Sequence, residues 1–190
     1  MRLSSLFLLL PAFALGGCER ITLDGEDHDD TDQGAIRWHR CPEPSSPDAL
    51  VIPAVVSSER ERNPDGTKLA LFQCWEFKYA VPSVPGLETA SLIPWGNFAE
   101  SFQFDIKGAY HQPPHSPPAV SLIVFTSGEG TMTIPGTGQK WRGRGGDILI
   151  AADTDGSHEM DWKAGTRVVD FSFSDLEAIP AHEVVPARGA

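Results

Sequence analysis

The chain has few basic residues for its length. Its 190 residues hold 15 Lys and Arg against 26 Asp and Glu, which gives a formal net charge of -11 at pH 7. Proteins that bind nucleic acids draw much of their affinity from clustered Lys and Arg side chains, which pair with phosphates. We therefore expect no nucleic-acid partner.

Segments with helical periodicity are also missing. No run of ten or more residues repeats its apolar side chains at the 3.6-residue period of an amphipathic helix. Doubly wound α/β folds and TIM barrels need such helices between their strands and are therefore improbable. Instead, 18 Gly and 16 Pro separate short apolar runs, as is typical of turn-rich β proteins. The sequence favours an all-β closed barrel or jelly roll.

The N-terminal apolar stretch is too short for a transmembrane helix. It covers residues 3–15 behind Arg2, and this length suits the apolar region of a signal peptide. The segment Leu15-Gly-Gly-Cys18 resembles the bacterial lipobox, whose cysteine becomes the lipidated first residue of the mature protein. We expect residues 1–17 to be a signal peptide and Cys18 to be lipidated, with an ordinary cleavage site as the alternative.

Cysteine is scarce, with three residues in the chain. In an exported protein an odd number leaves one thiol unpaired, and assigning Cys18 to lipid leaves Cys41 and Cys74 as a candidate disulfide. Such a bridge closes a loop of about 32 residues and stabilises by about 3 to 4 kcal/mol in the chain-entropy model. In the alternative interpretation, Cys74 is a small buried hydrophobe inside a strand.

Composition divides the rest of the chain into three segments. Residues 18–48 form a lipid-anchored acidic linker and N-terminal extension, because residues 19–32 carry seven acids against one Arg. Residues 49–175 have the length of a single domain, and residues 176–190 form a tail. We expect a lipoprotein of the cell envelope, facing the periplasm or the exterior, or a secreted soluble protein if Cys18 is unmodified.

Short apolar runs with period-2 alternation predict the strands of this domain. Trp75, Phe77 and Tyr79 share one face of a run; they could stack on a ligand ring, but core packing is the favoured interpretation. The predicted strands are Leu50–Val56, Leu69–Tyr79, Thr89–Ile93, Phe102–Ile106, Val120–Thr126, Thr131–Ile134, Asp147–Ala151 and Arg167–Phe173.

The segment from Tyr110 to Phe173 resembles the core of cupin barrels. In the order usual for cupins it has His115, a strand that leads into the turn Ser127-Gly-Glu-Gly130, and then Gly145-Gly-Asp-Ile-Leu-Ile150 before His158. It is most similar to small single-domain cupins. The resemblance implies an antiparallel β-barrel of the double-stranded β-helix or jelly-roll type. It also implies a small-molecule ligand inside the barrel and allows a homodimer.

Cupin metal centres use three histidines, often with one carboxylate, around Fe, Mn, Ni, Cu or Zn. Here His115 and His158 occupy two of the four positions, while Ser121 stands at the carboxylate position. A divalent metal would need a third ligand, and His111 is the candidate. Pro113 lies between His111 and His115 and forbids a helix there, so these two histidines lie on an extended or turning segment.

Alternation along two strands predicts the wall of the barrel cavity. One strand contributes the face that starts at Ser121, and the other contributes the face of His158, which leaves Glu159 on the opposite side. The residues that we expect to contact a ligand are Ser121, Ile123, Phe125, Met160 and Trp162. The histidines of the linker, a loop and the tail are expected to be exposed to solvent: His28, His39 and His182.

Two functions stay open at this level. The first is an exported, lipid-anchored cupin-domain protein that binds a small molecule in its barrel, which the loss of two metal-ligand positions favours. The alternative is a metal-dependent dioxygenase, isomerase or lyase that uses His115 and His158 with a third ligand such as His111. The sequence does not identify the molecule.

Overall fold

The computed structural model describes residues 37–80, 85–87 and 90–188. The chain divides into residues 1–34 and a second, compact unit from Ala35 to Ala190. The predicted signal peptide, Cys18 and His28 lie outside the described residues. Within the described ranges, no helix is long and apolar enough to cross a membrane.

The described residues form twelve strands and one short 3-10 helix. The strands are β1 (Arg37–Trp38), β2 (Ala49–Arg62), β3 (Lys68–Lys78), β4 (Phe98–Asp105), β5 (Tyr110–His115), β6 (Ser121–Ser127), β7 (Glu129–Thr133), β8 (Gln139–Arg144), β9 (Ile148–Ala152), β10 (His158–Trp162), β11 (Arg167–Phe173) and β12 (His182–Val185). The helix η1 covers Leu176–Ala178.

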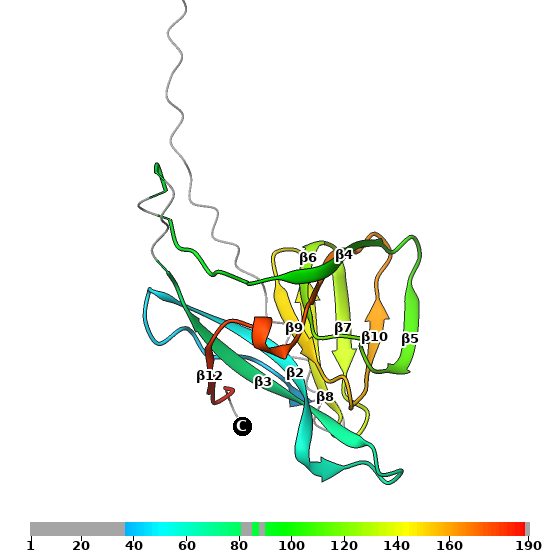
Figure 1. Cartoon of the computed structure of the whole chain (residues 1–190). Coiled ribbons are helices and arrows are strands. Elements are labelled where there is room, and N and C mark those ends of the chain that lie inside the picture. Colours follow the sequence, from blue (N-terminus) through cyan, green and yellow to red (C-terminus); the bar gives the residue numbers. More distant parts are fainter. Residues whose placement is uncertain (1–36, 81–84, 88–89, 189–190) are drawn as a thin grey trace, which may run out of the picture. The chain divides into compact units, whose positions relative to one another are not determined.

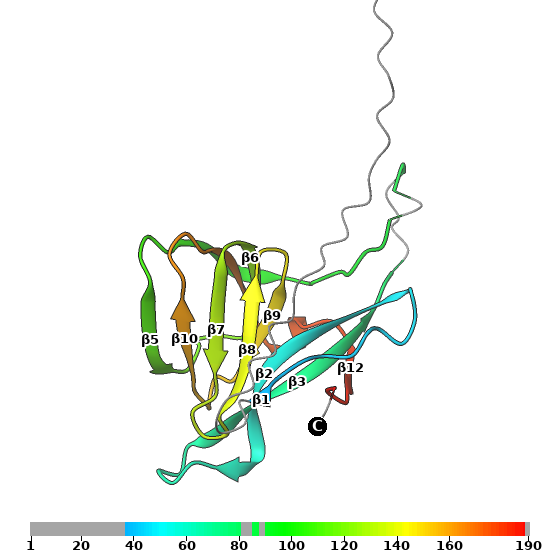
Figure 2. The same cartoon turned by 180° about the vertical axis from the view of Figure 1, so that it is seen from behind.

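Eight consecutive strands, β4 to β11, form a jelly roll. The seven-stranded sheet contains the order β4-β11-β6-β9, and the five-stranded sheet contains β5-β10-β7-β8. Counted from β4, the two sheets read 1-8-3-6 and 2-7-4-5, which is the jelly-roll arrangement of two interlocked Greek keys. Figures 1 and 2 show β5, β10, β7 and β8 side by side as one layer. The predicted all-β jelly roll is confirmed.

Three further strands extend the seven-stranded sheet. β2 pairs in parallel with β9 and antiparallel with β3, and β12 adds to the far side of β3. Cys74 in β3 forms a disulfide with Cys41, which ties the N-terminal extension to the sheet. The predicted cysteine pair is therefore the pair that the structure joins. The predicted tail also contributes β12, a strand beyond the expected end of the domain at residue 175.

Most predicted strands are confirmed, but in the predicted strand 89–93 the described residues, 90–93, do not form one. In its described part, from residue 90 onward, it makes an isolated bridge between Leu92 and Ala80, and Pro94 follows directly. The sequence also hides strand β5, because Pro113 and Pro114 argue against regular pairing. β5 lies at the edge of its sheet. Proline has no backbone N–H, and an edge strand tolerates it where that N–H would face solvent.

Two apolar clusters lie on opposite faces of the seven-stranded sheet. Leu149 belongs to the cluster between the two sheets, and its neighbour Ile150 belongs to the cluster on the outer face. Trp75 and Phe77 are buried in the outer cluster, away from the interior of the jelly roll. The interpretation of these aromatic residues as core is therefore confirmed.

Two histidines that we expected to be exposed are packed against aromatic rings. His39 is 8% exposed and stacks on Phe72, because the disulfide at Cys41 holds this segment against β3. His182 is half-buried, and the centre of its ring lies 3.9 Å from that of Trp75, because β12 pairs with β3. The prediction of exposure was wrong for both, since contacts between segments far apart in the sequence decide their burial.

Candidate ligand-binding cavity

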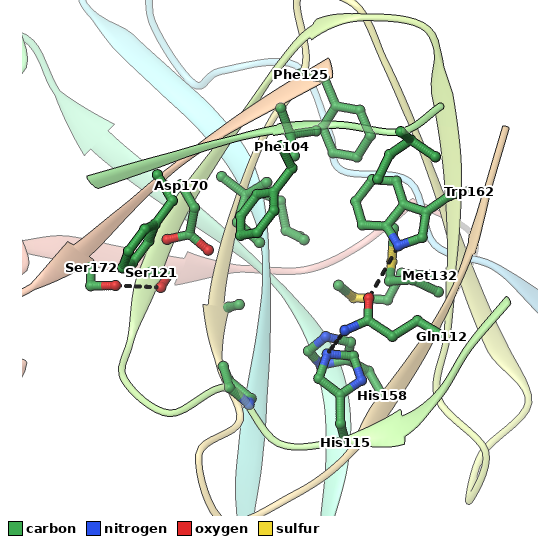
Figure 3. A pocket seen from close by; sticks show the side chains of 18 of the residues that line it. Phe104, Gln112, His115, Ser121, Phe125, Met132, His158, Trp162, Asp170 and Ser172 are labelled. Atoms are coloured by element: carbon green, nitrogen blue, oxygen red, sulfur yellow. Dashed lines mark hydrogen bonds between the residues drawn. The ribbon is translucent and has the colours of Figure 1, made fainter. Parts of the chain in front are cut away.

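A cavity of about 370 Å³ lies between the two sheets of the jelly roll. His115 and His158 line it (Figure 3). All the residues that alternation predicts for its wall line it as well: Ser121, Ile123, Phe125, Met160 and Trp162. Their position in the wall is therefore confirmed, while contact with a ligand stays a prediction.

The cavity opens between two edge strands. Phe102 and Phe104 of β4 and Tyr110 of β5 all line the cavity, yet their exposed fractions are 47%, 47% and 55%. β4 and β5 each form the outer edge of a sheet and do not pair with each other. The deep part of the wall is apolar and buried, where Phe125 stacks on the Trp162 indole. A ligand would thus pass exposed aromatic rings before it reaches the interior.

A chain of three hydrogen bonds fixes the side chain of His115. Its Nδ1–H donates to the carbonyl oxygen of Pro113 (3.0 Å), and its Nε2 accepts from the Gln112 amide (2.9 Å). The indole N–H of Trp162 donates to the Gln112 oxygen at 3.1 Å and so fixes the orientation of that amide. Burial holds the pKa of His115 below its usual value. Its imidazole is therefore neutral at pH 7, and both nitrogens are occupied.

His158 is held by a buried carboxylate. Its Nδ1–H donates to Oδ2 of Asp153 at 2.8 Å, and both side chains are buried. The turn that places Asp153 is closed by the Gly156 N–H on the Asp153 carbonyl (2.9 Å), and any side chain at Gly156 would press on Ala70. The His158 ring packs edge-on against His115, with centres 4.6 Å apart. Its Nε2 makes no hydrogen bond within the described part of the chain, so a lone pair faces the cavity side.

A second polar group lies on the opposite wall. Ser121 of β6 and Ser172 of β11 have their hydroxyl oxygens 3.4 Å apart, and Asp170 of β11 lines the cavity beside them (Figure 3). Burial raises the pKa of Asp170, and the Ser121 hydroxyl offsets part of this effect. The Asp170 Oδ1 is buried without a hydrogen-bond partner. Among the described residues, Asp170 is thus the one carboxyl that lines the cavity, and the protein leaves one of its oxygens without a hydrogen-bond partner.

The structure does not support His111 as a third metal ligand. Its Nδ1 lies 2.8 Å from Oδ1 of Asp161, and more than half of each side chain is exposed. Gln112, the next residue of β5, lines the cavity instead. Successive side chains of a strand point to opposite sides, so His111 faces outward, and the prediction that it joins His115 and His158 was wrong.

The cavity residues do not fit a metal centre with three protein ligands. His115 Nε2 is already bound to Gln112, and among the described residues no third His, Cys, Asp or Glu forms a cluster with His115 and His158. Within the described residues, three donors come within 4.8 Å of one another at His39, Cys41 and Cys74. His39 Nε2 lies 3.2 Å from the Cys74 sulfur, but the two sulfurs are joined as a disulfide. This cluster has metal-binding residue types, but its thiolates are not free.

The fold and the cavity together define a jelly-roll domain with a mainly apolar site that opens between two edge strands. Among solved structures, the chain is similar to the cupin domain of Cnp3 from Schizosaccharomyces pombe, with 17% sequence identity and a TM-score of 0.34. The match covers 68% of this chain and 87% of that chain. No protein-family model and no curated protein sequence matches the chain. The fold assignment rests on the strand order, and function is argued from the residues of the site.

Proposed function

We propose that the jelly roll binds a small, mostly apolar organic molecule in the cavity between its sheets. The cavity of about 370 Å³ falls in the usual range for small-molecule sites, and its wall is mainly aliphatic and aromatic with a few polar groups. The observation that carries the proposal is that polar side chains from both sheets line this mainly apolar space. His158 of β10 lines it on one side and Asp170 of β11 on the other.

A cavity of this size is unusual for a core that serves stability alone. Protein interiors pack at crystal-like density, with few voids larger than a water molecule. Here Phe125 and Met132 are buried around the space without filling it. Two walls that each carry oriented polar groups also favour a ligand with a fixed orientation, as is usual in specific binding sites.

The test is a ligand-observed NMR screen of fragment-sized aromatic compounds on the protein without residues 1–17. Ala151→Phe places a ring in the cavity, since Ala151 lines it and is 1% exposed. Ala99→Phe, at an exposed position of β4, is the matched control. We expect hits that the Ala151 variant loses and the Ala99 variant keeps. Absence of hits, or hits that both variants keep, would contradict a site in the cavity.

A catalytic role for His158 is the second candidate. A carboxylate that orients an imidazole through Nδ1, while Nε2 faces a substrate cavity, is the arrangement of many general bases and of metal-bound histidines.

A metal-dependent enzyme would require His115 to exchange its Gln112 partner for the ion. Metal analysis of the wild-type protein, His115→Ala and His158→Ala distinguishes the two functions. Stoichiometric Fe, Mn, Ni, Cu or Zn that both variants lose would replace the binding function with a metal centre.

Membrane attachment through Cys18 belongs to the same proposal. The leader and the lipobox-like segment support export and lipidation, and the acidic residues after Cys18 support a solvated spacer before the domain. The domain would then collect its ligand in the cell envelope.

A further inference from the structure

Among the described residues, the cavity wall contains an acidic side chain and no Lys or Arg. Asp170 is the sole Asp or Glu among the described residues that line the cavity, and no Lys or Arg lines it. The nearby Asp153 does not line the cavity; its Oδ2 is paired with His158, and its Oδ1 is buried without a partner. An anionic ligand would therefore find no cation in the wall, whereas a cationic ligand would find a carboxylate. The net charge of -11 further favours the approach of cations.

Asp170 is placed to hold a ligand group. In β11 it stands opposite Ile123 of β6 and Phe102 of β4, and directly opposed residues of antiparallel strands lie on the same face. Its Oδ1 has no hydrogen-bond partner, although the atom is buried. Buried carboxylate oxygens normally have partners, so the protein satisfies this carboxylate only in part.

The two cavity histidines do not oppose a cation. The pKa of His115 is lowered by burial, and its Nδ1–H is used by the Pro113 carbonyl. Its Nε2 accepts from Gln112 and so carries no proton. The Nδ1–H of His158 donates to the Asp153 carboxylate. The negative charge of this carboxylate would balance a positive charge on the imidazole. Tyr110, the other titratable group of the wall, lies at the exposed opening.

The neighbouring aromatic ring favours the same kind of group. Phe102 lines the cavity directly across the β4–β11 pair from Asp170. The face of an aromatic ring attracts an ammonium group, most strongly where water is excluded. A carboxylate, two hydroxyls and an aromatic ring are thus gathered on one wall, and the rest of the lining is apolar apart from Gln112, Tyr110 and the two histidines.

We infer that the ligand is an amphipathic organic amine whose ammonium group pairs with Asp170 and whose apolar body fills the interior. This inference rests on the proposed small-molecule site and specifies its ligand class. The opposite wall, at Gln112 and His158, then contacts the far end of the molecule (Figure 3).

Three probes of similar shape test the inference: 2-phenylethylamine, 2-phenylethanol and 3-phenylpropanoate. Their dissociation constants are measured by NMR titration on the wild-type protein, Asp170→Asn and Asp161→Asn. Asp161 is the matched control, because it is an exposed carboxylate outside the cavity. We expect the amine to bind at least about ten-fold more tightly than the alcohol, as one charge-assisted hydrogen bond provides. Asp170→Asn should abolish this preference, and Asp161→Asn should leave it intact.

The outcomes separate the two proposals. If the alcohol or the acid binds as well as the amine, or if Asp170→Asn keeps the preference, the inference is wrong while the cavity remains a binding site. If none of the probes binds and the fragment screen gives no cavity hits, the proposed function and the inference both fail.

Discussion

The Nδ1 of His158 and the Oδ2 of Asp153 lie 2.8 Å apart in a fully enclosed pair, and the Nδ1 of His111 and the Oδ1 of Asp161 lie 2.8 Å apart in an exposed one. The two pairs have the same residue types and the same distance. They differ in their access to water, which decides how much each contributes to stability.

We expect Asp153→Ala to lower the free energy of unfolding by about 1 to 3 kcal/mol, because it leaves the Nδ1–H of His158 buried without an acceptor. Asp161→Ala should cost less than about 1 kcal/mol, since exposed pairs contribute little. Urea unfolding at pH 7 measures both values. Equal losses in the two variants would show that burial is not what distinguishes the pairs.

Asp170→Asn should make the protein more stable at neutral pH. Burial raises the pKa of Asp170 in the folded state. The folded protein then holds the proton more tightly than the unfolded chain, so the carboxyl lowers stability as pH rises from its unfolded pKa of about 3.9 through the folded pKa. Urea unfolding should show a gain for the variant at pH 7 and little difference at pH 3. A loss at pH 7 would mean that the carboxylate has a stabilising partner.

Replacing both Cys41 and Cys74 by Ser should lower the free energy of unfolding by about 3 to 4 kcal/mol, the value for a loop of this length in the chain-entropy model. The bonded cysteines are 33 residues apart. Chemical reduction of the wild-type protein should give the same loss, and the double variant should then be insensitive to reductant. A reductant effect that persists in the double variant would point to a cause other than this bridge.

Cys18→Ser should release the protein from the membrane fraction of bacterial cells that express the full chain. Lipidation requires the thiol of Cys18, so the variant carries no lipid anchor. Immunoblotting of soluble and membrane fractions measures the shift, with the double variant Cys41→Ser and Cys74→Ser as the control that keeps its anchor. An unchanged distribution for Cys18→Ser would argue against lipidation.

The wall of the cavity follows from the sequence where strands alternate without interruption. Ser121, Ile123 and Phe125 lie in one regular strand, so fixing the direction of Ser121 fixes the other two. Their positions, and the jelly roll itself, are therefore predictable. The same rule, applied to β5, would have placed the side chains of His111 and Gln112 on opposite faces. The prolines between His111 and His115 obscure this strand in the sequence.

Asp170 was missed for a different reason. In β11 the residues Val168, Asp170 and Ser172 alternate with Val169, Phe171 and Phe173, so both faces of this strand contain apolar side chains. The alternation of side chains in β11 therefore does not show which of its faces points into the cavity. The pairing of β11 with β4 and β6 decides it, and that pairing joins segments more than forty residues apart. The feature of the sequence that could have revealed Asp170 is a single carboxylate inside a largely apolar strand.

The disulfide also determines how the domain responds to a pull on its N-terminal segment. Residues 37 and 38 pair with β8, and the His39 N–H donates to the Lys140 carbonyl, so these hydrogen bonds would yield first. The covalent link from Cys41 to Cys74 comes next and transfers the load to β3. β3 is not one of the eight jelly-roll strands. Once the hydrogen bonds to β8 have broken, a pull on this segment would therefore load β3, which lies outside the eight jelly-roll strands.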